Sequence, residues 1–345
     1  MVNRREFLQA TAAGGVGMVA TDLAYAVPSG AVPTKIQIPE AEKIVITVVT
    51  DNYYDQFRLD DKIAKRHFSK KRFGNCLHAE HGLAYHIETV VNGEAHSGLF
   101  DYAVLSDGVL RNLDLLEIDF KNVEALALSH DHGDHNAAMA EVLRAKKSDF
   151  TKTIPFYIGE QFFAGTYIRR RGEIFPASPL KREEVERLGF VRITEIKGPT
   201  PFIPGAYLPG RIELVTDYEK LSPMFLAKKG NEFVQETFLG EQTVILNAKG
   251  KGLVVLSGCA HRGIVNAIRQ AQTMTGIEKV HAIMGGFHLI NAKPEVILKT
   301  VADFKEINPD YIVPTHCTGF EAITTFAREM ADKFILNTAG TRYII

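Results

Sequence analysis

The sequence has too few cysteines, and too even a charge balance, for several classes of protein. Only three cysteines occur in 345 residues, so no disulfide framework can form and at least one thiol stays unpaired. Forty Lys and Arg side chains against 41 Asp and Glu leave a net charge of −1, which lacks the basic excess that non-specific nucleic-acid binding requires. Beyond the N-terminus, no segment is long and uncharged enough to span a membrane. With 46% hydrophobic residues, we expect a globular protein that buries a sizeable core.

The N-terminus has the features of an export signal. The adjacent Arg4 and Arg5 precede a Gly/Ala-rich apolar stretch over residues 10–20, and Ala24-Tyr25-Ala26 forms a small-x-small cleavage site. The arginine pair, followed by Phe-Leu, resembles the twin-arginine signal, whose export machinery moves folded proteins. We therefore predict a periplasmic or otherwise exported protein that has no stable membrane span after processing. An ordinary amphipathic N-terminal helix is the alternative.

Hydrophobic periodicity divides the rest of the chain into two kinds of structure. Runs of β-branched and aromatic residues at 44–49, 83–91 and 98–104 predict strands. From residue 253 onward, short apolar strands alternate with helical patterns, which predicts a β-α-β-α half. An all-β beginning thus meets an α/β end.

The predicted domain organisation has three parts. The signal covers residues 1–26, a linker covers 27–42, and one domain covers 43–345. Residues from about 150 to 245 show no clear period, and we expect a loop-rich insertion there, because functional loops are mounted on rigid scaffolds.

One six-residue segment concentrates metal-binding side chains. His130 and His132 directly follow a buried-strand pattern, and in extended backbone two residues with this spacing point the same way and can hold one cation. Gly133 permits a turn, after which Asp134 and His135 can face a second cation. Histidine and carboxylate ligands suit zinc first, with iron or manganese as alternatives where oxygen ligands dominate.

Three later strand ends also carry histidines. His261, His288 and His316 each follow a predicted strand in the β-α-β-α half, and Cys259 precedes the first of them. Because α/β units place their sites at the carboxyl ends of strands, we expect these side chains to meet the segment that begins at His130.

The pattern His-x-His-x-Asp-His resembles the signature of the metallo-β-lactamase superfamily. That resemblance implies an α/β fold, a four-layer αββα sandwich with metals at one edge of two facing sheets. Three further segments, Gly258 to Asn266, Gly285 to Leu289 and Pro314 to Gly319, resemble the subgroup that contains the archaeal dihydropterin ribofuranosylaminobenzene-phosphate synthase. Residues 51–52 and 80–83 resemble N-terminal segments of the same subgroup, so the resemblance extends over about residues 43–320.

The resemblance implies two metal ions with three ligands each. The first set is His130, His132 and His261, and the second is Asp134, His135 and His316. Cys259 stands where most members have a bridging aspartate, so it is a thiolate ligand, a group beside the ligands or an inert core thiol. His288 can replace His261 or hydrogen-bond the substrate. The third ligand of the first metal stays open, because residues 230–258 contain no histidine.

Two adjacent divalent cations predict hydrolysis. They lower the pKa of a bridging water, and Asp134 can orient that water and accept its proton, which leaves a metal-bound hydroxide for attack on an ester, phosphoester, lactone or related bond. The alternatives are a metal-dependent synthase like the pterin enzyme, which the export signal disfavours, and a non-catalytic metal- or partner-binding protein.

The substrate is predicted to be a small molecule. An anionic substrate is favoured if the basic residues of the chain face the site, although a solvated charged surface explains these residues as well. These basic residues are Lys62, Lys65, Arg66, Lys70, Lys71, Arg72 and Arg169 to Arg171. Aromatic residues in the insertion can line a pocket over the metals or simply pack a loop. They are Phe156, Tyr157, Phe162, Phe163 and Tyr167.

Overall fold

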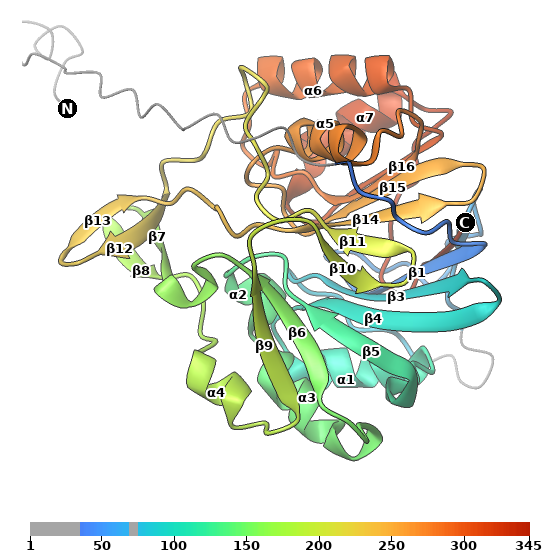
Figure 1. Cartoon of the computed structure of the whole chain (residues 1–345). Helices are drawn as coiled ribbons and strands as arrows, with labels where there is room; N and C mark the ends of the chain where they lie inside the picture. The colour runs from blue at the N-terminus through green and yellow to red at the C-terminus, as the bar shows by residue number, and fades with distance from the viewer. Residues whose placement is uncertain (1–34, 69–74) are drawn as a thin grey trace, which may run out of the picture. The chain divides into compact units, whose positions relative to one another are not determined.

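A computed structural model describes residues 35–68 and 75–345 of the chain (Figure 1). These residues belong to one compact unit, Thr34–Ile345. The predicted signal and residues 27–34 of the predicted linker lie outside the described residues, as do Lys70, Lys71 and Arg72. No helix in the described part of the chain is long and apolar enough to cross a membrane.

Two large sheets face each other at the centre of this unit. The eight-stranded sheet has the order β2-β18-β1-β3-β4-β5-β6-β9, and the six-stranded sheet has the order β10-β11-β14-β15-β16-β17. The strands of the first are β2 (Ala64–Lys65), β18 (Arg342–Ile344), β1 (Lys43–Thr50), β3 (Ala84–Val91), β4 (Glu94–Tyr102), β5 (Val123–Ala127), β6 (Ile154–Gly159) and β9 (Val191–Ile196). Those of the second are β10 (Thr200–Ile203), β11 (Ala206–Leu208), β14 (Thr243–Ala248), β15 (Gly252–Ser257), β16 (Val280–Gly286) and β17 (Tyr311–Thr315).

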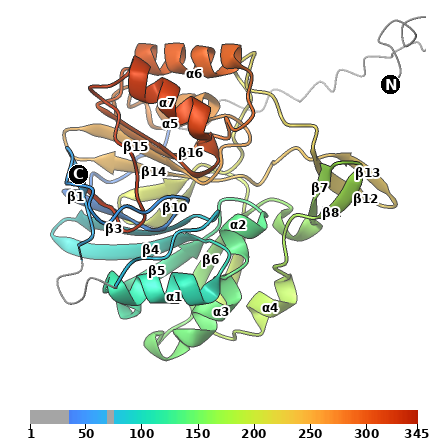
Figure 2. The ribbon, with the colours of Figure 1, turned by 180° about the vertical axis from the view of Figure 1, so that it is seen from behind.

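Helices cover the outer face of each sheet (Figure 1, Figure 2). On the eight-stranded sheet these are α1 (Ser106–Leu115), α3 (Met139–Ala145) and the short α4 (Arg182–Glu186). On the six-stranded sheet they are α5 (Ile264–Thr275), α6 (Pro294–Ile307) and α7 (Phe320–Glu329). The order of layers is therefore helix, sheet, sheet, helix, which confirms the predicted αββα sandwich.

Burial on both faces explains why the core strands have continuous apolar sequences. In β15, Val254 and Leu256 pack between the sheets, whereas Leu253 and Val255 pack under the helices. Successive side chains of a strand point to opposite faces, so a strand covered on both sides needs apolar residues at every position. The strands predicted from such runs, including those that became β1, β3 and β4, are confirmed.

Residues 150–245 contain more regular structure than we expected. β6 and β9 extend the first large sheet, and β10, β11 and β14 begin the second. A separate four-stranded sheet, β13-β12-β7-β8, consists of β13 (Glu232–Gln235), β12 (Phe225–Lys229), β7 (Thr166–Arg170) and β8 (Glu173–Pro176). Every residue of β8 and β13 is exposed, so these strands have no alternating apolar pattern that sequence periodicity can detect.

Candidate metal centre

The histidines predicted as ligands come together at one edge of the two large sheets. His130 and His132 follow β5, and His135 lies in the short α2 (Gly133–Asn136). His261 follows β15, and His316 begins a single 3₁₀ turn after β17. β15, β16 and β17 are parallel, so their carboxyl ends lie at the same edge and bring these loops to the same place.

Two groups of side chains have the arrangement of metal ligands. Within each group, every donor atom lies within 4.8 Å of every other. The first group is Asp134, His135, Cys259 and His316, and the second is His130, Cys259 and His261. Imidazole, carboxylate and thiolate are the donors that zinc and related divalent cations use, so these residues fit metal ions. The two groups share Cys259.

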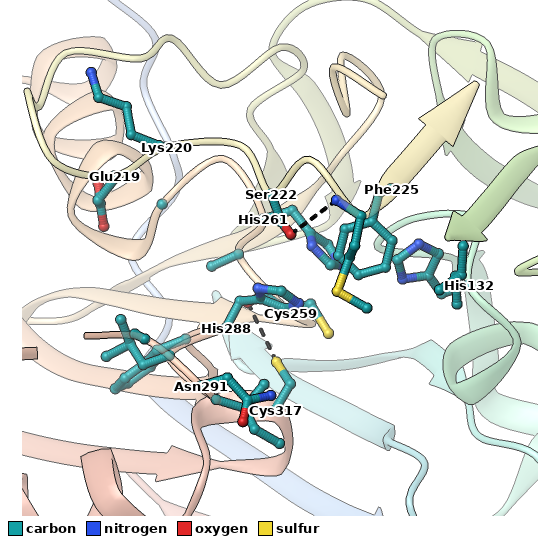
Figure 3. A pocket seen from close by; sticks show the side chains of 18 of the residues that line it. His132, Glu219, Lys220, Ser222, Phe225, Cys259, His261, His288, Asn291 and Cys317 are labelled. Atoms are coloured by element: carbon teal, nitrogen blue, oxygen red, sulfur yellow. Dashed lines mark hydrogen bonds between the residues drawn. The ribbon is translucent and has the colours of Figure 1, made fainter. Parts of the chain in front are cut away.

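Two other predicted candidates lie beside these groups. The ring centroid of His132 is 4.5 Å from that of His130 and 4.8 Å from that of His261. Its buried Nε2 has no hydrogen-bond partner among residues 35–68 and 75–345, and coordination to a cation would satisfy it. His288 packs on His261 with a centroid distance of 4.1 Å and belongs to neither group, although Figure 3 shows both rings at the same cavity.

A buried carboxylate, which sequence reasoning missed, orients two of the histidines. Asp101 is the second-last residue of β4, has a φ of 62° and accepts from His135 Nδ1 at 2.7 Å. It also accepts from the Ser129 hydroxyl at 2.8 Å, and that hydroxyl lies 2.8 Å from His130 Nδ1. The Asp101 carboxylate can only accept, and the Ser129 hydroxyl already donates its proton to Asp101, so its oxygen accepts from His130. Both histidines therefore carry a proton on Nδ1 and direct Nε2 into the site.

Burial keeps most of the imidazoles neutral. It is the main cause that lowers the pKa of His130 and His261 well below the usual value, and neighbouring imidazoles lower it further. Burial likewise lowers the pKa of His132 to about 3. In His135, burial lowers the pKa, but Asp101 and Asp134 raise it by more. A neutral imidazole is the form that binds a metal ion.

Asp134 lies where the site meets solvent. Its carboxylate is 3.2 Å from His316 Nε2, 3.8 Å from His135 Nε2 and 3.5 Å from His81 Nε2. Burial by itself raises the pKa of Asp134, but His135 and His316 lower it by more, so the carboxyl stays ionised. His81 is exposed and stacks on His316 with a centroid distance of 4.8 Å. His81 belongs to the segment 80–83 that resembles the subgroup, and the fold places it beside Asp134 and His316.

Two more buried carboxyls hold the loops that carry the ligands. Glu241 accepts from the backbone N–H groups of His261 at 2.6 Å and Arg262 at 2.7 Å, and burial raises its pKa to about 7. Asp51 accepts from Thr315 Oγ1, one residue before His316. The resemblance had pointed to residues 51 and 52, but no local pattern distinguishes Glu241 from a surface glutamate.

A cleft of about 920 Å³ opens over the metal centre. Phe225, the first residue of β12, forms one wall and packs on His132 and His261 at centroid distances of 4.7 and 4.9 Å (Figure 3). Phe238 stacks on His261 at 4.1 Å. The separate four-stranded sheet thus covers one side of the site.

The aromatic residues predicted to line the pocket pack elsewhere. Phe156, Phe162 and Phe163 belong to the core under α1 and α3, and Tyr157 packs between the large sheets. Tyr167 packs edge-to-face against Phe233. None of them lines the main cleft, and loop packing, the alternative explanation, accounts for them.

Of the basic residues considered for substrate attraction, Arg170 lines the cleft, whereas Arg169 and Arg171 do not. Lys62, Lys65 and Arg66 bind Phe334 O, Asp60 and Leu336 O away from it. The surface explanation therefore holds for that cluster. Lys220 and Lys293, which we had not singled out, also line the cleft.

Comparisons with known proteins agree with this geometry. No family model matches the chain. The 7,8-dihydropterin-6-methyl-4-(β-D-ribofuranosyl)-aminobenzene-5′-phosphate synthase of Methanocaldococcus jannaschii is 32% identical over 267 residues, which are 76% of this chain and 89% of the synthase. The solved structure of Tm1679, a metal-dependent hydrolase of the β-lactamase superfamily, covers 87% of this chain and 98% of its own, with 25% identity and a TM-score of 0.66. The chain belongs to the metallo-β-lactamase superfamily.

Membership accounts for the position of the centre at the edge of two facing sheets. A second relative, the uncharacterized protein MJ0448 of the same archaeon, is 25% identical over 265 residues, 76% of this chain and 92% of that protein. In this member of the metallo-β-lactamase superfamily, the ligand groups, the buried imidazoles and the cleft together support a metal-dependent enzyme.

Proposed function

We propose that this protein is an exported hydrolase that uses two divalent cations, zinc first, to cleave an ester, phosphoester, lactone or related bond in a small molecule. The observation that carries the proposal is the pair of ligand groups at the base of one open cleft. Two sets of converging donors separated by a shared side chain suit two adjacent cations better than one. The solvent-facing Asp134 beside them supplies a carboxylate at the reaction site.

The protein's own residues position and move a proton. Bound cations supply Lewis acidity, which makes a water molecule a better nucleophile at neutral pH and polarises the bond under attack. Asp134 stays ionised, so it can orient that water and accept its proton. His81 lies 3.5 Å from the same carboxylate and faces solvent, which provides a route for the proton out of the cleft. No serine or cysteine nucleophile is required.

The cleft walls favour a substrate with an anionic group and an apolar body. Arg170, Lys220 and Lys293 line it, and none of them forms an ion pair with another residue in the described part of the chain. On the apolar side, Phe175 and Leu289 are among the lining residues. Glu219 and Glu295 line the cleft as well, and Glu219 accepts from the backbone N–H groups that begin α5. The unpaired cations attract anions, while apolar surfaces supply contact area.

The test is metal analysis of the processed protein, together with a panel of ester, phosphoester and lactone substrates. We expect two bound cations per chain and hydrolysis of at least one class, with Asp134→Asn lowering kcat by about 100-fold or more. His132→Ala should lower metal content. Asp131→Asn is the matched control, because Asp131 lies in the same motif and contacts Asn136 instead of a ligand. Two tightly bound metals without hydrolysis of any panel member would argue against the proposal.

Substrate charge is tested separately with Lys220→Glu. We expect KM to rise for an anionic ester and to stay within about twofold for its neutral analogue, because one favourable charge becomes an unfavourable one. Lys228→Glu is the control, since Lys228 is exposed on β12 but does not line the cleft. Equal effects on both substrates would exclude a role for Lys220 in recognising charge.

The identity to the archaeal synthase favours a second candidate function, in which the same centre forms a bond instead of cleaving one. Export separates the two, because a soluble phosphorylated biosynthetic intermediate is expected in the cytoplasm. Fractionation of cells that express the full chain should find the processed protein outside the cytoplasm, and replacing Arg4 and Arg5 by Lys should retain it inside. A wild-type protein found only in the cytoplasm would favour the synthase. A normally folded protein with almost no metal would favour a non-catalytic role.

A further inference from the structure

Cys259 lies between the two ligand groups. It follows Gly258 at the end of β15, and only 2% of its surface is exposed. Its Sγ is 3.1 Å from Nε2 of His135, a member of the first group. The same sulfur lies within 4.8 Å of donor atoms of His130 and His261, which form the second. One buried thiol therefore faces both places where histidine nitrogens converge.

The ring nitrogens around this sulfur lie close to it and to one another. His130 and His135 have Nδ1 committed to Ser129 and Asp101, which leaves a lone pair on each Nε2. The Nε2 of His130 lies only 3.2 Å from that of His261. Two nitrogen lone pairs at this distance repel unless a cation or a proton lies between them.

A buried, unpartnered imidazole gives an independent sign of a ligand in the first group. His316 is 3% exposed, and neither of its ring nitrogens makes a hydrogen bond of normal geometry with another described residue. Its Nε2 nevertheless lies 3.2 Å from the Asp134 carboxylate. Donor atoms this close, without a hydrogen bond between them, are arranged to bind a common cation.

We propose that the thiolate of Cys259 bridges the two cations, one held with His130 and His261 and the other with Asp134, His135 and His316. The inference rests on the two-cation centre of the proposed function. A thiolate sulfur has several lone pairs and binds zinc at about 2.3 Å, so it can contact two ions at once. On loading, the thiol proton leaves to solvent and the sulfur takes the two metal bonds in its place.

The neighbouring Cys317 provides a matched control. It is also buried and lines the same cleft, but it belongs to neither ligand group. Its Sγ lies 3.6 Å from the carbonyl oxygen of Cys259, as a weak donor to the backbone (Figure 3). A spectroscopic signal from a thiolate bound at this centre should therefore come from Cys259 and not from Cys317.

The test is titration of the metal-free protein with Co²⁺, followed by the near-ultraviolet thiolate-to-cobalt charge-transfer band and by direct metal counting. With a bridging sulfur, the band changes during both the first and the second equivalent. We expect Cys259→Ser to lose the band and to bind at least one ion fewer, and Cys259→Asp to bind two ions without the band. Cys317→Ser should match the wild type.

Several results would overturn the bridge. A band that is complete at the first equivalent while a second ion still binds makes Cys259 a ligand of one cation only. Two bound Co²⁺ ions without any band, or a band retained in Cys259→Ser, exclude the thiolate altogether, and neither result bears on hydrolysis. Failure of the wild-type protein to bind Co²⁺ or Zn²⁺ would reject the bridge together with the proposed function. A bridged pair that hydrolyses no substrate would reject only the hydrolase.

Discussion

Replacing Asp101 by Asn tests whether a residue outside both ligand groups sets their metal affinity. One Asp101 oxygen accepts from the backbone N–H of Ser129 at 2.7 Å, and the other accepts from the Ser129 hydroxyl at 2.8 Å and from His135 Nδ1 at 2.7 Å. An amide has one acceptor oxygen and one donor nitrogen. Whichever way the new amide group is turned, a donor faces a donor in a site with no access to water.

The expected loss follows from these contacts. Removing a buried hydrogen-bond acceptor leaves its donor unsatisfied, at a cost of about 1–3 kcal/mol. Relief by moving the proton of His135 to Nε2 blocks the nitrogen that faces the metal centre. Loss of such an orienting carboxylate weakens metal binding about 10- to 100-fold, which corresponds to about 1.4–2.7 kcal/mol. Because Ser129 connects Asp101 to His130 as well, both ligand groups should be affected.

The assay is competition for Zn²⁺ between the protein and a chromophoric chelator, with metal counting after dialysis. Asp101→Asn should show weaker binding of both ions, while Asp131→Asn, with the same change at a buried carboxyl that contacts Asn136, should bind like the wild type. Unchanged affinities in Asp101→Asn would show that this carboxylate does not orient the ligands. Equal weakening in both variants would attribute the effect to general destabilisation instead.

Three further predictions address stability. Burial is the main cause that lowers the pKa of His86 from 6.5 to about 4, and the nearby Arg342 lowers it further. Between pH 6.5 and 4 the native state therefore binds fewer protons than the unfolded chain. The free energy of unfolding should fall by up to about 3 kcal/mol as the pH drops through this range. Chemical denaturation at several pH values should show a smaller acid loss in His86→Gln but not in His96→Gln, and equal losses would contradict the assignment. A Cβ at Gly258 would overlap Ser129 Oγ. Gly258→Ala should therefore lower the free energy of unfolding by about 1–3 kcal/mol and reduce the metal content. An unchanged melting temperature would disprove this close packing. Removing the metal with a chelator should lower the melting temperature, because a cation at 100 times its Kd stabilises the native state by about 2.7 kcal/mol. An unchanged melting temperature after confirmed metal removal would contradict binding to the folded state alone.

Local patterns in the sequence carry part of the site. His130 to His135 lie within six residues after a buried strand, so their proximity requires no knowledge of the fold. The apolar run of β15 and the helical period of α5 indicate which side chains are buried, because apolar side chains favour the core. For that reason these elements and the ligand-bearing strand ends could be predicted from local patterns, whereas the layer order followed from the resemblance to the superfamily.

The rest of the site depends on which distant strand ends meet in the folded protein. Asp101 reaches His135 from β4, Glu241 reaches His261 from the loop before β14, and Cys259 comes to lie between two histidine groups. In the sequence, these residues look like any other strand-end acid or core thiol. Their contacts follow from strand order and register, which arise from long-range packing of whole sheets and leave no mark in the neighbouring residues.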